Sequence, residues 1–193
     1  MQSVCVFCGS STGIDPAYAE AARSLGRTLA EANVRLVFGG GHVGLMGVVS
    51  NAVIEAGGEA IGVIPHFLVE RELAHAGLSD LRIVDTMHER KAMMSDLSEA
   101  FIALPGGTGT LEEFFEVFTW AQLGEHRKPC GLLNVAGYYD TLVTVFDHMV
   151  RNGFLSSSDR SLLLVETEPT TLIGRFEEYE PPAKTKWIDR TET

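Results

Sequence analysis

Seven short apolar segments recur along the chain, and stretches with helical spacing separate most of them. The apolar segments cover residues 3–10, 34–41, 59–65, 81–86, 99–107, 129–135 and 161–166. The helical patterns cover residues 16–32, 45–56, 87–97, 110–123, 140–151 and 170–178. Strand and helix alternating at this spacing indicate βαβ units. We therefore predict a doubly wound α/β fold, with a mainly parallel sheet and helices on both faces.

The length and composition fit one globular domain. The chain has 193 residues, of which 45% are hydrophobic and 21% charged, and this length suits a single domain. The last stretch is polar and contains Pro181 and Pro182. We expect a domain over residues 1–180 and a surface tail over residues 181–193.

The charge excludes one large class of partner. The formal net charge is −11 at pH 7, whereas a nucleic acid polymer requires a basic face. A small anionic ligand stays compatible, because a local cluster of backbone N–H groups can outweigh the overall field. The start of the chain has no charged-then-apolar leader, and no apolar run approaches the roughly 20 residues that span a bilayer. We expect a cytoplasmic protein with no membrane partner.

The cysteines and histidines do not have metal-site spacing. Cys5, Cys8 and Cys130 lie in or beside apolar segments, and no second closely spaced pair completes a zinc site. Buried thiols are the preferred interpretation. No His-x-x-x-His pair occurs at helical spacing, so we expect no metal site, and we also expect no cofactor.

Three of the predicted strands run into turns of small residues. These turns are CGSS (8–11), GGGHVGLMG (39–47) and PGGTGT (105–110). One such turn can reflect tight packing alone, but the carboxyl ends of parallel strands share one edge, where open sheets bind ligands. The first two turns supply the candidate ligand contacts Gly9, Ser10, Gly40, Gly41 and Met46.

The third turn is typical of a phosphate site. A glycine-rich loop that opens a helix directs free backbone N–H groups at an anion, and the helix dipole adds to the attraction. It lacks the lysine of a P-loop and the spacing of G-x-G-x-x-G, which argues against a kinase or NTPase. The candidates here are Gly106, Gly107, Thr108, Gly109 and Thr110.

Two adjacent glutamates follow this loop, and their role stays open from the residues alone. Thr110 and Glu113 fit the capping box T-x-x-E, which local propensity favours. Alternatively, a carboxylate faces the crevice beyond the phosphate, where it can bind sugar hydroxyls or stabilise a cationic centre. A ribose that adjoins the phosphate fits this second interpretation.

Arg90 and Lys91 follow the fourth predicted strand and bring positive charge near the same edge. An arginine suits bidentate contact with a phosphate or carboxylate, although a solvated surface pair is an equal alternative. There is no G-x-S-x-G nucleophile elbow, and no lysine is marked by its surroundings as a Schiff-base amine.

These motifs together resemble one family. CGSS, GGGHVGLMG, MHERKAMM and PGGTGTLEEFFEVFTWAQLG are similar to those of the LONELY GUY (LOG) family of cytokinin riboside 5′-monophosphate phosphoribohydrolases, many members of which were labelled lysine decarboxylases. The resemblance runs from about residue 3 to about residue 180. The family motif P-G-G-x-G-T-x-x-E is matched in full, from Pro105 to Glu113.

The resemblance implies a fold, an activity and roles for particular residues. It implies a Rossmann-like nucleotide-binding catalytic domain that cleaves an (N6-prenyl) adenosine 5′-monophosphate to a free base and ribose 5-phosphate. The loop 107–110 corresponds to the 5′-phosphate site, and Arg90 and Glu113 to the catalytic pair. A carboxylate there suits the oxocarbenium character that develops on the ribose. The remaining implied ligand contacts are Glu72, Lys91, Glu112 and Thr119.

The assembly and two alternative functions complete the expectations. The family forms dimers, so we expect a homodimer, and apolar residues around much of segment 114–124 fit either a subunit contact or a helix deep in the monomer. Molybdenum-cofactor carrier proteins resemble the family in architecture, so a nucleotide or phosphorylated-cofactor carrier is one alternative; a carrier needs neither Arg90 nor Glu113. An amino-acid decarboxylase would need a lysine for pyridoxal phosphate.

Overall fold

A computed structural model describes residues 1–70, 74, 75, 77, 78 and 80–182 of the chain. Its strands are β1 (Ser3–Phe7), β2 (Arg35–Phe38), β3 (Ala60–Pro65), β4 (Asp80–Val84), β5 (Phe101–Ala103), β6 (Cys130–Leu133) and β7 (Leu163–Glu166). Its helices are α1 (Pro16–Glu31), α2 (Gly44–Glu55), α3 (His66–Val69), α4 (Met87–Asp96), α5 (Thr108–Leu123), η1 (Val135–Gly137), α6 (Asp140–Arg151), α7 (Ser157–Arg160) and α8 (Pro169–Glu177). The expected tail falls mostly on residues 183–193, which lie outside the described part.

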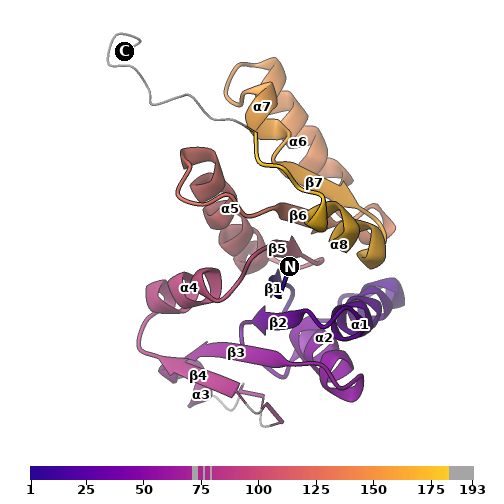
Figure 1. The fold of residues 1–193 in the computed structure, drawn as a ribbon, viewed down its shortest axis with the longest axis vertical. Coiled ribbons are helices and arrows are strands. Elements are labelled where there is room, and N and C mark those ends of the chain that lie inside the picture. The colour runs from indigo at the N-terminus through magenta and orange to yellow at the C-terminus, as the bar shows by residue number, and fades with distance from the viewer. Residues whose placement is uncertain (71–73, 76, 79, 183–193) are drawn as a thin grey trace.

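The described strands form one parallel sheet in the order β4-β3-β2-β1-β5-β6-β7 (Figure 1). Strand β1 pairs with β2 on one side and with β5 on the other, so that Cys5 lies opposite both Val37 and Phe101. The prediction of a doubly wound parallel sheet is confirmed. The direction of winding reverses between β1 and β5, and open α/β sheets bind ligands beyond the carboxyl ends of the strands at such a point.

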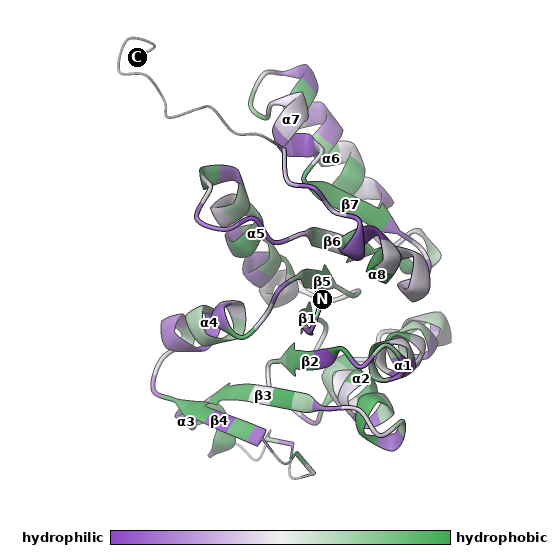
Figure 2. Cartoon of the chain, in the orientation of Figure 1, coloured by the Kyte–Doolittle hydropathy of each residue, from purple (hydrophilic) through white to green (hydrophobic). Residues whose placement is uncertain are grey.

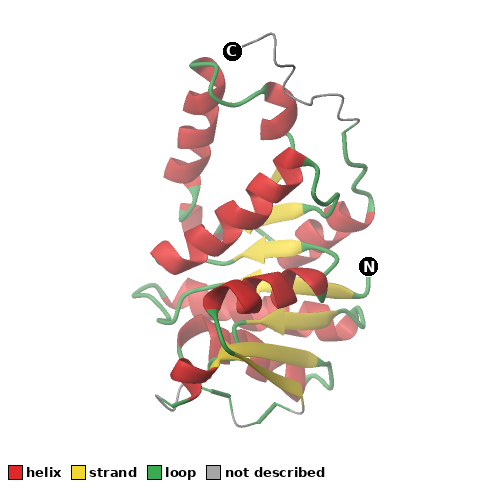
Figure 3. Ribbon diagram, turned by 90° about the vertical axis from the view of Figure 1, so that its left-hand side faces the viewer, coloured by secondary structure: helices red, strands yellow, loops and turns green. Residues whose placement is uncertain are grey.

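Helices lie on both faces of the sheet (Figure 3), and alternate residues of β1 face different helical layers. Val4 and Val6 pack in a cluster with α1, α2 and α8, whereas Cys5 and Phe7 pack in a cluster with α4, α5 and α6. Because both faces are covered, the inner strands of the sheet are mostly apolar (Figure 2). The outer strand β4 is less buried and carries Asp80 and Arg82.

Most predicted helices occur near their expected positions, with differences at the ends. Asp15 accepts a hydrogen bond from the Ala17 amide at 2.9 Å and so caps α1. The strands predicted over residues 34–41 and 99–107 end earlier, at Phe38 and Ala103, because the small residues beyond them form loops. The short helices α3, α7 and η1 were not predicted; none exceeds four residues.

The start of α5 corrects one interpretation. The helix begins at Thr108, with Gly107 as an N-cap that makes no side-chain bond. Thr110 therefore lies inside the first turn and is buried, so a capping box between Thr110 and Glu113 is wrong. The described structure instead has a capping box at α4, where Thr86 and Glu89 bond each other's backbone amides.

The described residues also bear on membranes and thiols. No helix among them combines the length and the apolar character needed to cross a bilayer. Cys5, Cys8 and Cys130 are free and buried, as expected. Burial raises the pKa of all three thiols well above the ordinary range.

Candidate active site

Three small-residue turns meet at the carboxyl edge of the sheet. The Gly9 amide donates to the Pro105 carbonyl at 3.1 Å, which joins the loop after β1 to the loop after β5. The Leu45 amide donates to the Gly9 carbonyl at 3.0 Å, which joins the turn after β2 to both. A side chain at Gly44 would come within 2.2 Å of the Ser10 backbone. The three turns predicted from separate strands therefore meet at one crevice.

A cavity of about 270 Å³ opens beside these turns. It is lined by the loop 9–13, by Leu45, by residues 105–107, and by the rings of Tyr18 and Tyr138. Four predicted contacts, at residues 9, 10, 106 and 107, line it. The cavity lies at the switch point between β1 and β5, where ligand binding is expected for this architecture.

The glycines of the third turn fall into two kinds. A Cβ at Gly106 would lie 2.1 Å from Oγ1 of Thr110 and 2.8 Å from the Gly9 amide, so packing requires glycine there. A Cβ at Gly107 or Gly109 would meet nothing within 4 Å, and neither residue has a positive φ. Neither packing nor backbone conformation requires glycine at these two positions. Open space at a helix N-terminus leaves the free amides accessible to an anion.

Arg90 is buried and bonded to three different elements. Its Nε donates to the Val63 carbonyl of β3 at 3.0 Å, and its Nη2 donates to the Gly39 carbonyl after β2, also at 3.0 Å. Its Nη1 lies 3.4 Å from Oε1 of Glu113 on α5. The interpretation of Arg90 as a solvated surface residue is therefore wrong.

Gly39 makes room for this guanidinium. A Cβ on Gly39 would lie 2.0 Å from Nη2 of Arg90 and 3.3 Å from Sδ of Met46. The predicted contact Met46, in the first turn of α2, therefore lies near the arginine on the other side of Gly39. The close approach of backbone and guanidinium is the physical reason for glycine at this point.

Glu113 lies beyond the anion-binding turn. It is five residues after Thr108, which places it about 8 Å along the axis of α5 from the helix start. Its side chain is 13% exposed. Burial raises the pKa of Glu113, and Glu112 and Glu116 act in the same direction, while Arg90 and Lys91 oppose the shift. The helix start and this carboxylate are thus separated along α5, so an anion would suit the first position and a positive charge the second.

Lys91 is engaged by two other carboxylates of α5. Its Nζ lies 2.5 Å from Oε1 of Glu112 and 3.1 Å from Oε1 of Glu116. Burial alone would lower the lysine pKa, but these two bonds raise it overall. Lys91 therefore stays a cation that holds two acidic side chains beside Glu113. The other oxygen of Glu116 is buried without a hydrogen-bond partner among the described residues.

Four other predicted contacts remain to be placed relative to the Arg90–Glu113 pair. Gly40 accepts a hydrogen bond from the His75 amide at 2.9 Å, and Gly41 pairs with Ala74. Glu72 lies outside the described residues. Thr119 is exposed, and its hydroxyl donates to the Phe115 carbonyl within α5 at 2.7 Å, so in this structure it is not part of the central cluster.

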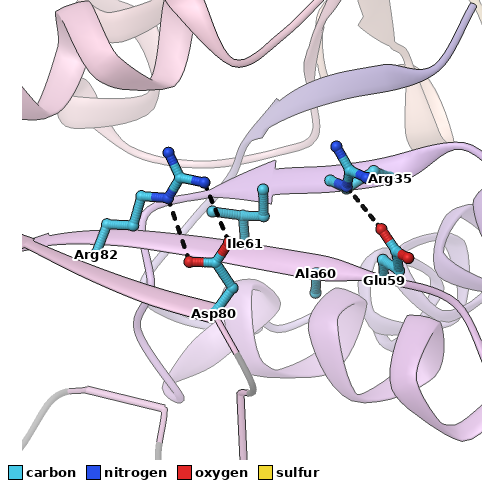
Figure 4. A pocket seen from close by; sticks show the side chains of 6 residues that line it. All are labelled: Arg35, Glu59, Ala60, Ile61, Asp80 and Arg82. Atoms are coloured by element: carbon cyan, nitrogen blue, oxygen red, sulfur yellow. Dashed lines mark hydrogen bonds and ion pairs between the residues drawn. The ribbon is translucent and has the colours of Figure 1, made fainter.

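A second concavity, of about 310 Å³, lies at the opposite edge of the sheet (Figure 4). Arg35 pairs with Glu59 at 2.8 Å, and Arg82 pairs with Asp80 at 3.2 Å. It lies where β3 and β4 begin, whereas ligands of parallel sheets bind where strands end. Its charges compensate one another, so it is not a candidate active site.

Sequence reasoning missed Tyr138, Glu116 and Gly39. Tyr138 follows β6, and its hydroxyl donates to the Gly106 carbonyl at 2.6 Å. The sequence feature that could have indicated Tyr138 is its position just after β6, a strand that ends at the same edge of the sheet as β5. Glu116 was indicated only by its spacing, one helical turn after Glu112 and Glu113. Among the described residues, no group of three or more His, Cys, Asp or Glu side chains could hold a metal ion.

Comparison with known proteins identifies the family. Residues 46–176 match the family described as "Possible lysine decarboxylase". The chain is 52% identical over 178 residues to the cytokinin riboside 5′-monophosphate phosphoribohydrolase LOG7 of Arabidopsis thaliana, covering 92% of this chain and 82% of the relative. It is also 52% identical over 179 residues to the probable enzyme LOGL5 of Oryza sativa subsp. japonica, covering 93% and 73%.

A solved structure shows the same fold at lower identity. The molybdenum cofactor binding protein from Rippkaea orientalis aligns with a TM-score of 0.69 and 18% identity, covering 92% of this chain and 96% of that one. At this identity the likeness concerns the fold alone, so it does not favour a carrier function. From the matched family and the two relatives, the chain belongs to the LOG family.

Proposed function

We propose that this chain hydrolyses the N-glycosidic bond of an adenosine 5′-monophosphate, with or without an N6-prenyl group. The products are the free base and ribose 5-phosphate. The observation that carries the proposal is the contact between the largely buried side chains of Arg90 and Glu113 at 3.4 Å, about 8 Å along α5 from its open start. The relatives' names, cytokinin riboside 5′-monophosphate phosphoribohydrolase, support the same reaction.

The start of α5 is the proposed 5′-phosphate site. The free amides of residues 107–110 and the positive end of the helix dipole favour an anion. Gly107 and Gly109 add no side chain that would obstruct it. Among the described residues, those that line the adjoining cavity include no lysine or arginine, so the protein relies on backbone donors there rather than on a salt bridge.

Glu113 is the proposed catalytic carboxylate. As the bond between C1′ of the ribose and the base nitrogen breaks, its electron pair leaves with the base and the ribose becomes cationic. The ionised carboxylate stabilises that cation and orients the attacking water. The water delivers hydroxide to C1′, and its proton balances the charge on the departing base. One such electrostatic contact contributes about 10²–10³ in rate.

Arg90 is proposed to keep Glu113 ionised and in place. Burial raises the pKa of the carboxyl, and the guanidinium is the first contribution that lowers it. Two backbone carbonyls fix the guanidinium, so it presents Nη1 toward the carboxylate without freedom to swing away. A preorganised charge of this kind costs no reorganisation during the reaction.

The test is direct turnover. The purified chain is incubated with AMP and, separately, with N6-isopentenyl-AMP, and the free base is separated by chromatography. We expect base and ribose 5-phosphate in equal amounts from at least one nucleotide, and the ratio of the two rates reports the preference at N6. A folded protein that releases no base from either nucleotide contradicts the proposal.

We further propose that the chain works as a homodimer. Support comes from apolar side chains that stay at the surface on or beside α5 and α6: Leu123 of α5 is 71% exposed, and Val145 of α6 and Phe154, in the turn after α6, are also exposed. Size-exclusion chromatography with light scattering should give twice the mass of 21.0 kDa. A mass of one chain over the working concentration range would contradict this. The cytoplasmic location stays a prediction, compatible with the three free thiols.

A further inference from the structure

We propose that Tyr138 is a positioning residue for the phosphate subsite, acting through the carbonyl of Gly106. The inference rests on the proposed function only in that the start of α5 binds the 5′-phosphate. The Tyr138 hydroxyl donates to the Gly106 carbonyl at 2.6 Å. The ring stands at the surface of the cavity formed by loops 9–13 and 105–107.

Each backbone carbonyl of the β5–α5 loop (residues 104–107) accepts a hydrogen bond. Leu104 accepts from the Tyr139 hydroxyl at 2.6 Å, and Pro105 accepts from the Gly9 amide at 3.1 Å. Gly106 accepts from Tyr138, and Gly107 accepts from the Leu111 amide at 3.2 Å, inside the helix. With all four carbonyls bonded in this way, the loop has a single orientation. At the start of α5 beyond it, a Cβ at Gly107 or Gly109 would meet no atom within 4 Å, so no side chain covers the first amides of the helix at these positions.

Two consecutive tyrosines reach two carbonyls because the turn before them is unusual. In η1, Ala136 has φ 49° and Gly137 has φ 73°, and the first of these is strained for a residue with a side chain. The Asn134 side chain holds the turn by accepting from the Tyr139 amide at 2.7 Å. Strained backbone persists where the surrounding structure fixes it, and such sites concentrate near ligands.

The two tyrosines differ in a way that separates positioning from packing. Tyr139 is 1% exposed and belongs to the core beneath the loop. Tyr138 is 42% exposed, so its hydroxyl could bond water at no cost to the core. It instead bonds the loop, and its ring meets Tyr18 edge-on, with centroids 5.6 Å apart. The consequence of the Tyr138 bond therefore falls on the loop and on what binds there.

The test compares Tyr138→Phe with the wild type in the full-length chain. Phenylalanine keeps the ring and its edge contact and removes only the donor. We expect the dissociation constant for inorganic phosphate, measured by titration calorimetry, to rise about five- to tenfold, the range of one hydrogen bond. The KM for AMP should rise by the same factor, while kcat stays within about twofold.

Thr28→Val is the matched control. The Thr28 hydroxyl donates to the Ser24 carbonyl at 2.9 Å within α1, so the variant also removes one hydroxyl-to-carbonyl bond. We expect its phosphate affinity and KM to equal those of the wild type. A Tyr138→Phe protein with unchanged phosphate affinity overturns the inference, even if its melting temperature is lower than that of the wild type. If the wild type releases no base, the proposed function fails, and the calorimetric comparison still decides the role of Tyr138.

Discussion

The guanidinium of Arg90 lies 3.4 Å from the carboxylate of Glu113, and both side chains are almost fully shielded from solvent. The two residues stand on α4 and α5, which pack on the same face of the sheet. The arginine also bonds the backbone of β3 and of the turn after β2. The Arg90 side chain thus connects four segments: α4, α5, β3 and the turn after β2. This arrangement makes the roles of both residues testable separately from the fold.

Glu113→Gln is expected to abolish base release while the fold persists. Glutamine keeps the volume of the side chain but cannot stabilise a cation, so kcat should fall by about 10²–10³ or more. Because burial already disfavours the charged form of Glu113, the melting temperature at pH 7 should stay within a few degrees of the wild type. Turnover assays and thermal unfolding measured together decide this. A glutamine variant with full turnover removes Glu113 from the mechanism.

Arg90→Lys is expected to damage both activity and stability. Lysine keeps the positive charge but places its donors on one nitrogen, which cannot reach the Val63 carbonyl, the Gly39 carbonyl and Glu113 together. A buried carbonyl that loses its partner costs about 1–3 kcal/mol, so the melting temperature should fall by several degrees. Calorimetry and turnover measure the two effects. An active lysine variant of unchanged stability would contradict the geometric role.

With rising pH, kcat/KM should increase while the stability contributed by Glu113 decreases, and both trends follow from the titration of this one carboxyl group. The pKa of Glu113 is raised in the folded protein, so kcat/KM should rise with pH through a value above that of an ordinary glutamate. A raised folded pKa means that this group stabilises the fold below its unfolded pKa and loses that contribution as pH rises through the folded pKa. As the pH rises through the folded pKa, the unfolding free energy of the wild type should therefore fall relative to that of Glu113→Gln.

Thermal unfolding at each pH provides the control for this profile. Activity is compared only at pH values where both proteins are folded, so that acid unfolding does not imitate titration. A profile that falls only at the pKa of an exposed glutamate would show that burial does not tune the reaction. A stability difference that does not vary with pH would contradict the raised pKa itself.

The thiols should be unreactive in the native protein. Burial raises the pKa of Cys5, Cys8 and Cys130, so they stay protonated and inaccessible at pH 8. An aromatic disulfide reagent should titrate none of the three rapidly in buffer and all three in guanidinium chloride, as measured by absorbance. Rapid modification of Cys8, beside the crevice, would mean that the loop after β1 opens on the timescale of the reaction.

Sequence patterns predicted the sheet well because they record burial directly. The inner strand segments are apolar on both faces, and the three small-residue turns follow from parallel strands that end at one edge. What patterns could not give is contact between distant residues. Thr110 and Glu113 match a capping box in spacing, yet α5 begins two residues earlier, because Gly107 already provides the extended N-cap.

The same limit applies to Arg90 and Tyr138. An arginine next to a lysine at a helix start has the pattern of a solvated pair, and only tertiary packing shows that Arg90 is buried against two carbonyls. Tyr138 carries no local motif, since its function depends on a carbonyl of another loop. The resemblance to a family indicated Arg90 and Glu113 but gave no physical reason for their pairing.

Gly109→Ala and Gly106→Ala form the sharpest pair of variants for the phosphate subsite. Gly109 lies in the first turn of α5, and a methyl group added there would have no atom within 4 Å, so alanine should stabilise the helix by about 0.5–1 kcal/mol. The same methyl group would stand where a phosphate approaches the amides. We therefore expect a melting temperature a few degrees higher and a KM for AMP raised at least about tenfold, since a 1 Å displacement of a bound substrate can cost about 10²-fold in rate.

Gly106→Ala should lose both stability and turnover, because its methyl group would overlap Oγ1 of Thr110 and crowd the Gly9 amide. Overpacking of this kind costs about 1–3 kcal/mol, so the melting temperature should fall together with turnover. The contrast separates the two uses of glycine in one loop: packing at Gly106 and ligand access at Gly109. If Gly109→Ala gains stability and keeps the wild-type KM, the phosphate does not bind at the start of α5, and the subsite must be sought along the cavity beside Tyr18.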